Sequence, residues 1–295
     1  MKRSAFTMLE LIFAIVVMGV IGKFGVEFLA QSYRTFIQAK INNELHSNSA
    51  NTLQFIAKRL ESRIQPSVIK RIAGGAGFAG ATQLVANPDS YNVLEWISYD
   101  IDGFRGAAAP LWSGIVDLDP AVTTLTNIQS PNTNTAALNT LIGVLSNNGS
   151  TIANTAIMFS TESYSPNSFG WAGGDALIDQ SRAIHPINAT ANPNQFTSSI
   201  AGVNFNGMKI SNRYMLAWTA YAVVHDGVNL RFYYDYQPWQ GENYLNGKNE
   251  ILMQNINTFR IRTNPSGGIF SIMVCANSTL IVGEAHAICK EKVIF

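Results

Sequence analysis

The chain has 295 residues, of which 47% are hydrophobic and only 13% are charged, and its formal net charge is +1. A typical soluble domain has about 25% charged residues, and a disordered chain combines high net charge with little apolar content, so this composition excludes disorder and indicates one large or two small folded domains. A nucleic-acid-binding role is excluded as well, because no Lys or Arg occurs from Gly106 to Ser181 to contact phosphates.

At the N-terminus a short basic start precedes an apolar run, a pattern typical of export or membrane insertion. Lys2 and Arg3 come first, and residues 11–22 are uncharged. An ordinary signal peptide, cleaved near residue 30, is one interpretation. A plain membrane anchor is another, but it has to accommodate Glu10 at the head of the run. A carboxylate at bilayer depth costs about 2.5–3.5 kcal/mol, so such a group usually has a partner and a function.

The segment Phe6-Thr-Met-Leu-Glu10-Leu-Ile, behind a basic leader that ends in a small residue, resembles the prepilin cleavage and methylation motif. Type IV pilins and the pseudopilins of type II secretion share this motif. The resemblance implies that a prepilin peptidase cuts between Ala5 and Phe6 and methylates the new amine of Phe6. The leader of the family usually ends in Gly, and Ala5 departs from that pattern.

Cleavage would create a cationic amine at Phe6, one helical turn and about 6 Å before Glu10. In an apolar setting an unpaired charge is costly and a paired charge is tolerated. If neighbouring subunits are staggered by about one turn, the amine of one subunit can meet Glu10 of the next. We therefore expect Glu10 to control subunit register during assembly.

Apolar residues continue at helical spacing beyond the length that a membrane needs. The first series is Tyr33, Ile37, Ile41 and Leu45, and the second is Leu53, Ile56, Ala57, Leu60 and Ile64. No proline occurs before Pro66, so we expect one helix over residues 6–64. Residues 6–30 would span the membrane and residues 31–64 would be amphipathic, and Gly19, Gly22 and Gly25 are candidate bend points. The amphipathic half should pack on the chain's own C-terminal domain.

Residues 65–295 are expected to form a β-rich globular domain, which gives an α+β fold with an antiparallel sheet. Residues 65–80 are a glycine-rich connector, and residues 162–207 are expected to be irregular. The expected strands are residues 83–86, 94–101, 111–117, 156–160, 214–224, 228–236, 258–263, 269–275 and 287–295, with short helices at 135–145 and 250–254. The clearest hairpin turns at Asp226-Gly227, a strong tight-turn dipeptide.

Two cysteines, Cys275 and Cys289, lie near the C-terminus and match no zinc or redox spacing. One disulfide in an oxidising compartment is the simplest interpretation, and two free thiols in the core are the alternative. The pair is similar to the disulfide-bounded C-terminal region of type IV pilins. Residues 47–64 and the later hairpin, by contrast, resemble J-class minor pseudopilins and related minor pilins.

Catalytic and metal-binding patterns are weak in this sequence. No G-x-S-x-G or H-E-x-x-H motif occurs, and His225-Asp226 is placed in a turn. Asp100 and Asp102 are weak calcium candidates, because hard cations favour clustered carboxylates, but the rest of a calcium loop is missing. We therefore expect no catalytic residues, no cofactor and no enzyme activity. The hairpin around residues 218–239 is rich in aromatic residues, which should pack mainly in the core.

The resemblance implies a minor pilin or pseudopilin, inserted in the inner membrane by one span with its C-terminal domain in the periplasm. It would then enter a pseudopilus or a cell-surface pilus, at or near the tip. Its expected partners are other pilin subunits, the prepilin peptidase and the membrane. An adhesin displayed on the same stalk is the alternative, carried by the charge-free segment 120–154, and an anchored periplasmic enzyme is a third class.

Overall fold

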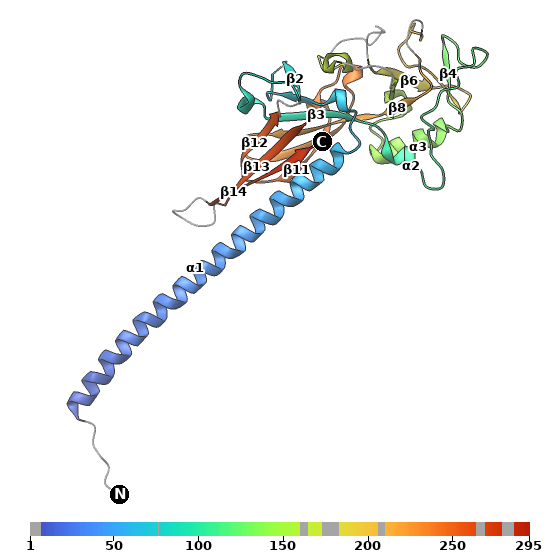
Figure 1. Ribbon diagram of the computed structural model, residues 1–295. Coiled ribbons are helices and arrows are strands. Elements are labelled where there is room, and N and C mark those ends of the chain that lie inside the picture. Colours follow the sequence, from blue (N-terminus) through green and yellow to red (C-terminus); the bar gives the residue numbers. More distant parts are fainter. Residues whose placement is uncertain are drawn as a thin grey trace.

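The computed structural model describes residues 7–75, 77–159, 165–172, 183–205, 210–263, 269–278 and 286–295. It has a long N-terminal helix followed by a domain of antiparallel β-sheets, which is the expected α+β class. Figure 1 shows the helix extending from one side of the domain, with the N-terminus at its far end.

The helices are α1 (Met8–Leu60), α2 (Ile101–Arg105) and α3 (Thr135–Leu145). The first strands are β1 (Ile69–Arg71), β2 (Phe78–Gly80), β3 (Val93–Ser98), β4 (Asn127–Gln129), β5 (Ala156–Phe159), β6 (His185–Ala189) and β7 (Gln195–Ser198). The later strands are β8 (Tyr214–Ala217), β9 (Thr219–His225), β10 (Leu230–Tyr236), β11 (Lys248–Met253), β12 (Ile256–Thr263), β13 (Phe270–Ser278) and β14 (His286–Ile294).

The strands form three sheets. Their orders are β11-β10-β9-β3-β1-β2, β12-β13-β14 and β4-β7-β6-β5-β8. The six- and three-stranded sheets lie next to the C-terminal half of α1, whereas the five-stranded sheet lies farther from the helix with α2 and α3 (Figure 1).

Helix α1 is continuous through the three candidate bend points, and it ends four residues earlier than expected. Its burial begins at Ile41, which is 5% exposed, whereas Tyr33 remains 67% exposed. The stripe that packs on the domain therefore starts later than the sequence spacing indicated. Leu53, Ile56 and Leu60 complete that stripe, and they join the inner faces of the six- and three-stranded sheets in one apolar core.

Strand β3 of the six-stranded sheet is buried on both faces. In β3, Leu94 and Trp96 face the core that contains α1, while Val93 and Ile97 face a second core on the opposite side. The third core lies between α3 and the five-stranded sheet. Because both faces of β3 are covered, the strand is mostly apolar, and its polar residues are Glu95 and, at its end, Ser98.

Glu95 is fully buried, and its charge is compensated by Arg71 of the neighbouring strand β1. Arg71 Nε lies 2.7 Å from Glu95 Oε1, and the Tyr236 hydroxyl donates to Glu95 Oε2 at 3.1 Å. A second Arg71 nitrogen donates to the carbonyl of Trp171 at 3.1 Å. Burial raises the pKa of Glu95, and the charge of Arg71 opposes that rise. These contacts connect β1, β3 and β10 through one polar group.

Several expected elements differ from the structure. The helix expected at 250–254 is wrong, because this segment belongs to β11 and pairs with β10, with Ile251 opposite Arg231. Pairing with a neighbouring strand decides the conformation of this short segment, whose apolar residues are consecutive and favour neither period. The strands expected at 83–86 and 111–117 are also wrong. The first is replaced by β1 and β2 inside the glycine-rich connector, and the second forms only a bridge between Ile115 and Arg213.

The strand expected at 214–224 is divided at Trp218. Residues before Trp218 form β8 and pair with β5, whereas residues after it form β9 and pair with β3 and β10. One run of chain thus passes from the five-stranded to the six-stranded sheet. The expectation of an irregular segment at 162–207 is wrong for β6 and β7. In contrast, the helix expected at 135–145 is confirmed with those bounds.

Candidate functional site

The N-terminal half of α1 exposes a continuous apolar surface. Phe13, Phe24 and Phe28 are 72%, 65% and 70% exposed. An 18-residue window of this helix is strongly apolar with no more than two charged residues, and none of the window is buried. Among the helices of the described residues, α1 is the one that is long and apolar enough to cross a membrane, judged by length and composition. A surface of this size is a site of interaction with lipid or with other protein chains.

Glu10 lies at the first turn of this apolar surface, where it forms a capping box with Thr7. The Thr7 amide and hydroxyl both donate to Glu10 Oε2, at 3.2 and 3.1 Å, and the Glu10 amide donates to Thr7 Oγ1 at 3.4 Å. The sequence analysis missed this pairing, although the Thr-x-x-Glu spacing before an apolar run is its known signature. Ala5 and Phe6, the two residues of the expected cleavage site, lie outside the described residues.

Two further charges interrupt the apolar surface. Lys23 Nζ lies 3.9 Å from Glu27 Oε1 one turn later, and the two side chains are 76% and 62% exposed. The spacing of four residues allows this contact on one face of the helix.

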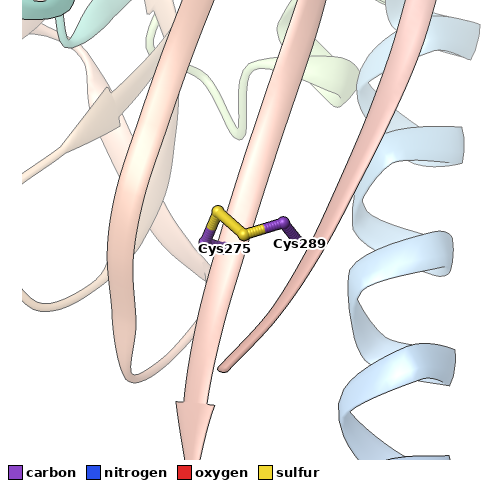
Figure 2. The surroundings of a disulfide bond; sticks show 2 residues. All are labelled: Cys275 and Cys289. Atoms are coloured by element: carbon purple, nitrogen blue, oxygen red, sulfur yellow. A yellow bond between two sulfur atoms is a disulfide. The ribbon is translucent and has the colours of Figure 1, made fainter. Parts of the chain in front are cut away.

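Cys275 and Cys289 form a disulfide, which excludes the alternative of free thiols at these positions. The two residues are directly opposite each other on the antiparallel strands β13 and β14. Figure 2 shows the bond joining these neighbouring strands while α1 runs beside them. The disulfide therefore closes the C-terminal hairpin on which the buried half of α1 packs.

Asp100 and Asp102 do not form a cation site with other ligands. Asp100 caps α2, since Gly103 N donates to its Oδ1 at 3.0 Å, and no group of three His, Cys, Asp or Glu side chains comes together in the described part of the chain. Burial raises the pKa of Asp100 to about 6, and the nearby charge of Asp102 contributes to the rise. The pair therefore has a structural position at the junction between β3 and the five-stranded sheet.

His225 and Asp226 also make structural contacts. Asp226 Oδ1 accepts hydrogen bonds from the amides of Val228 and Asn229, and its Oδ2 accepts from Arg231 Nε at 2.8 Å. The hydrogen bond from Arg231 holds the pKa of Asp226 well below its usual range. His225 Nε2 lies 3.0 Å from the carbonyl oxygen of Ile256. These contacts fit the expected hairpin turn.

The aromatic hairpin is packed on both sides. Phe232 stacks between Tyr221 and Tyr234 on the side of α1, with ring centroids 5.3 and 6.0 Å away. Tyr236 and Trp239 are buried in the core on the other side. The expectation that these residues lie mainly in the core is confirmed, and the second face is covered as well.

One open groove lies where α1 meets the domain. Its volume is about 550 Å³, and Ile41, Leu45 and Asn48 of α1 line it opposite Ile251 and Met253 of β11. The lining mixes apolar side chains with amides and hydroxyls.

Comparison with known proteins finds no matching family model, no matching curated protein and no matching solved structure. The class of this protein is therefore defined by its architecture alone. It has a long, apolar N-terminal helix that carries a β-rich domain with a disulfide, and this architecture is consistent in shape with a pilin.

Proposed function

We propose that this chain is a minor subunit of a type IV pilus or of a type II secretion pseudopilus, with α1 as its assembly element. The observation that carries the proposal is the division of α1 into two halves. From Ile41 onward one stripe of the helix is covered by the domain, whereas the apolar part over residues 8–30 is bare. A bilayer covers about 20 such residues, and a helix extracted from the bilayer needs other helices to cover the same surface.

Glu10 supports a fibre rather than a plain anchor. Its Oε2 accepts both Thr7 donors, and this arrangement places the carboxylate at the head of the apolar surface. In a simple anchor this charge serves only to cap the helix, whereas a fibre can also use it to bind the amine of the neighbouring subunit. In this proposal a prepilin peptidase cleaves between Ala5 and Phe6 and methylates Phe6. The β domain lies in the periplasm and then on the fibre, near its tip.

Mass spectrometry of the mature N-terminus tests the processing step. We expect a chain that starts at N-methyl-Phe6. The variant Ala5→Leu, which replaces the small residue before the cleavage site, should retain the leader. A wild-type chain that starts near Gln31 would instead indicate ordinary signal cleavage, and it would remove the half of α1 on which the proposal depends.

The substitution Glu10→Ala tests the assembly step. The variant should insert and fold normally, because Glu10 is far from the domain, but it should enter fibres poorly. Glu44→Ala is the matched control, since Glu44 is an exposed acid on the same helix beyond the bare half. Equal incorporation of both variants would contradict the role of Glu10.

A further inference from the structure

The Lys23–Glu27 contact leaves both charges incompletely bonded. A charge-assisted hydrogen bond is about 2.7–2.9 Å long, and the observed separation of 3.9 Å is well beyond that range. In water such an exposed pair contributes little, and the surrounding solvent satisfies both groups. Inside a bundle of apolar helices, however, each charge needs hydrogen bonds to compensate for its desolvation.

Lys23 and Glu27 both lie within the apolar length of the helix, where desolvation of a charge is costly. Measured from Leu11, where the uncharged run begins, Lys23 is about 18 Å and Glu27 about 24 Å along the helix axis. A bilayer core is about 30 Å thick. In the membrane the long Lys side chain can extend toward the headgroups, but in a fibre the same position is surrounded by other helices.

The spacing of these charges repeats the spacing at the N-terminus. After cleavage the order is a cation at Phe6 and an acid at Glu10, and the order at Lys23 and Glu27 is the same, again four residues apart. A parallel helix displaced by one turn, about 6 Å, therefore brings both cations level with both acids at once.

The two acids also share one side of a packed helix. They are separated by two heptads and three residues, which is the spacing from an a to a d position. The a and d positions between them are Phe13, Val17, Val20 and Phe24, all of them apolar and between 42% and 72% exposed. Lys23 is next to this seam, at a g position, from which it can reach an acid on the neighbouring helix.

We propose that Lys23 of one subunit binds Glu27 of a second copy of this chain, with the two α1 helices parallel and displaced by one turn. This inference rests on the proposed function, because it concerns how α1 packs in the fibre, and it adds that two copies of this chain lie next to each other there. The one-turn register is then specified twice, by the terminal amine with Glu10 and by Lys23 with Glu27.

Cysteine crosslinking tests the displacement in fibres collected from cells that produce the full-length chain. A Val20→Cys chain mixed with a Phe24→Cys chain reports helices displaced by one turn, and Val20→Cys alone reports helices without displacement. Cys275 and Cys289 are already joined to each other. We expect the mixed crosslink to exceed the Val20→Cys homodimer several-fold. A homodimer yield equal to or above the mixed yield would overturn the proposal.

Charge reversal then tests the pair itself. Adding Lys23→Glu to both chains, or Glu27→Lys to both, should reduce the mixed crosslink several-fold. Placing Lys23→Glu in the Val20→Cys chain and Glu27→Lys in the Phe24→Cys chain reverses both charges of the contact and should restore the mixed crosslink. Each helix then carries two like charges of its own, so the rescue cannot come from contacts within one helix. Failure of this rescue would show that the contact is only intrahelical.

These results are separable from a failure of the proposed function. Chains that begin at N-methyl-Phe6 and enter fibres, but show no preference for the displaced crosslink, contradict only the Lys23–Glu27 contact. Chains that keep the leader in cells, or never enter a fibre, contradict the proposed function whatever the crosslinks show.

Discussion

Replacing Arg71 with Met should reveal how strongly the buried Glu95 depends on its partner. Methionine preserves much of the apolar length of the side chain but removes the cation that lies 2.7 Å from the carboxylate. Removing one partner of a buried ion pair typically costs 3–5 kcal/mol, because the remaining charge is left without compensation. The lost hydrogen bond to Trp171 adds about 1 kcal/mol. We expect the free energy of unfolding to fall by about 4 kcal/mol at neutral pH.

The loss should depend on pH in a specific direction. Burial raises the folded-state pKa of Glu95, and removal of Arg71 should raise it further. A carboxyl group with a raised folded-state pKa favours the folded state only while it is protonated, and that contribution disappears as the pH rises through the folded-state pKa. The penalty of Arg71→Met should therefore be smallest at acidic pH, below the unfolded-state pKa of about 4.3 for glutamate, and largest above neutral pH.

Urea unfolding of the full-length chain in detergent, followed by tryptophan fluorescence at acidic and neutral pH, measures both effects. Arg71→Met combined with Glu95→Gln is the informative control, because Gln removes the charge and keeps an acceptor for Tyr236. The double variant should recover at least half of the lost stability at neutral pH. A penalty below about 1 kcal/mol, or one that does not change with pH, would refute this account of the buried pair.

Three further predictions concern stability of the domain. Asp100→Asn should reduce the rise in stability that the wild-type chain shows as the pH falls from about 6 to about 4. The folded-state pKa of Asp100 is about 6 against about 3.9 unfolded, so its share of that rise is at most about 3 kcal/mol. Urea unfolding of both chains across this pH range measures the difference, and identical pH profiles would contradict it. Replacing Cys275 and Cys289 with Ser should lower the unfolding free energy by up to about 3 kcal/mol, while the strand content measured by circular dichroism stays unchanged. An unchanged urea midpoint would contradict this prediction. Gly143→Ala should raise the thermal midpoint by an amount equivalent to about 0.5–1 kcal/mol, because Gly143 is inside α3 and alanine favours a helix more than glycine does. The added methyl group would lie 3.6 Å from Asn148 Oδ1, which is an ordinary contact, and a lower midpoint would contradict this expectation.

Some parts of the fold were predictable because they depend on local patterns. The apolar period and the absence of proline before Pro66 predicted α1, and the Asp226-Gly227 turn predicted the β9–β10 hairpin. The helix at 135–145 also follows from its own spacing. These elements agree with the structure because nearby residues determine them.

Other parts depend on contacts that the sequence does not display. The segment at 250–254 was expected to be a short helix, but its pairing with β10 makes it an edge strand. The segment 214–224 is divided at Trp218 because its first part pairs with β5 and its second part pairs with β3, which belong to different sheets. Burial of Glu95 was equally hidden, because Arg71 and Tyr236 come from distant positions.

At the candidate site, the sequence indicated Glu10 and the cysteine pair, and the structure adds the neighbours of each. Thr7 was inside the motif that the sequence analysis used, yet its bonds to Glu10 were not recognised. The calcium candidates share a short segment by sequence, but Asp100 turns inward to cap α2, so proximity in sequence did not create a shared ligand set.

The continuity of α1 has a mechanical consequence. A single rigid rod runs from the bare end into the domain, so tension on the domain passes into the rod without an intervening joint. Besides the covalent link at the end of α1, the strands β13 and β14 lie alongside the rod, and a pull along its axis acts on those contacts in shear. Because the Cys275–Cys289 bond crosslinks the two strands, neither can be peeled away alone, and they share the pull.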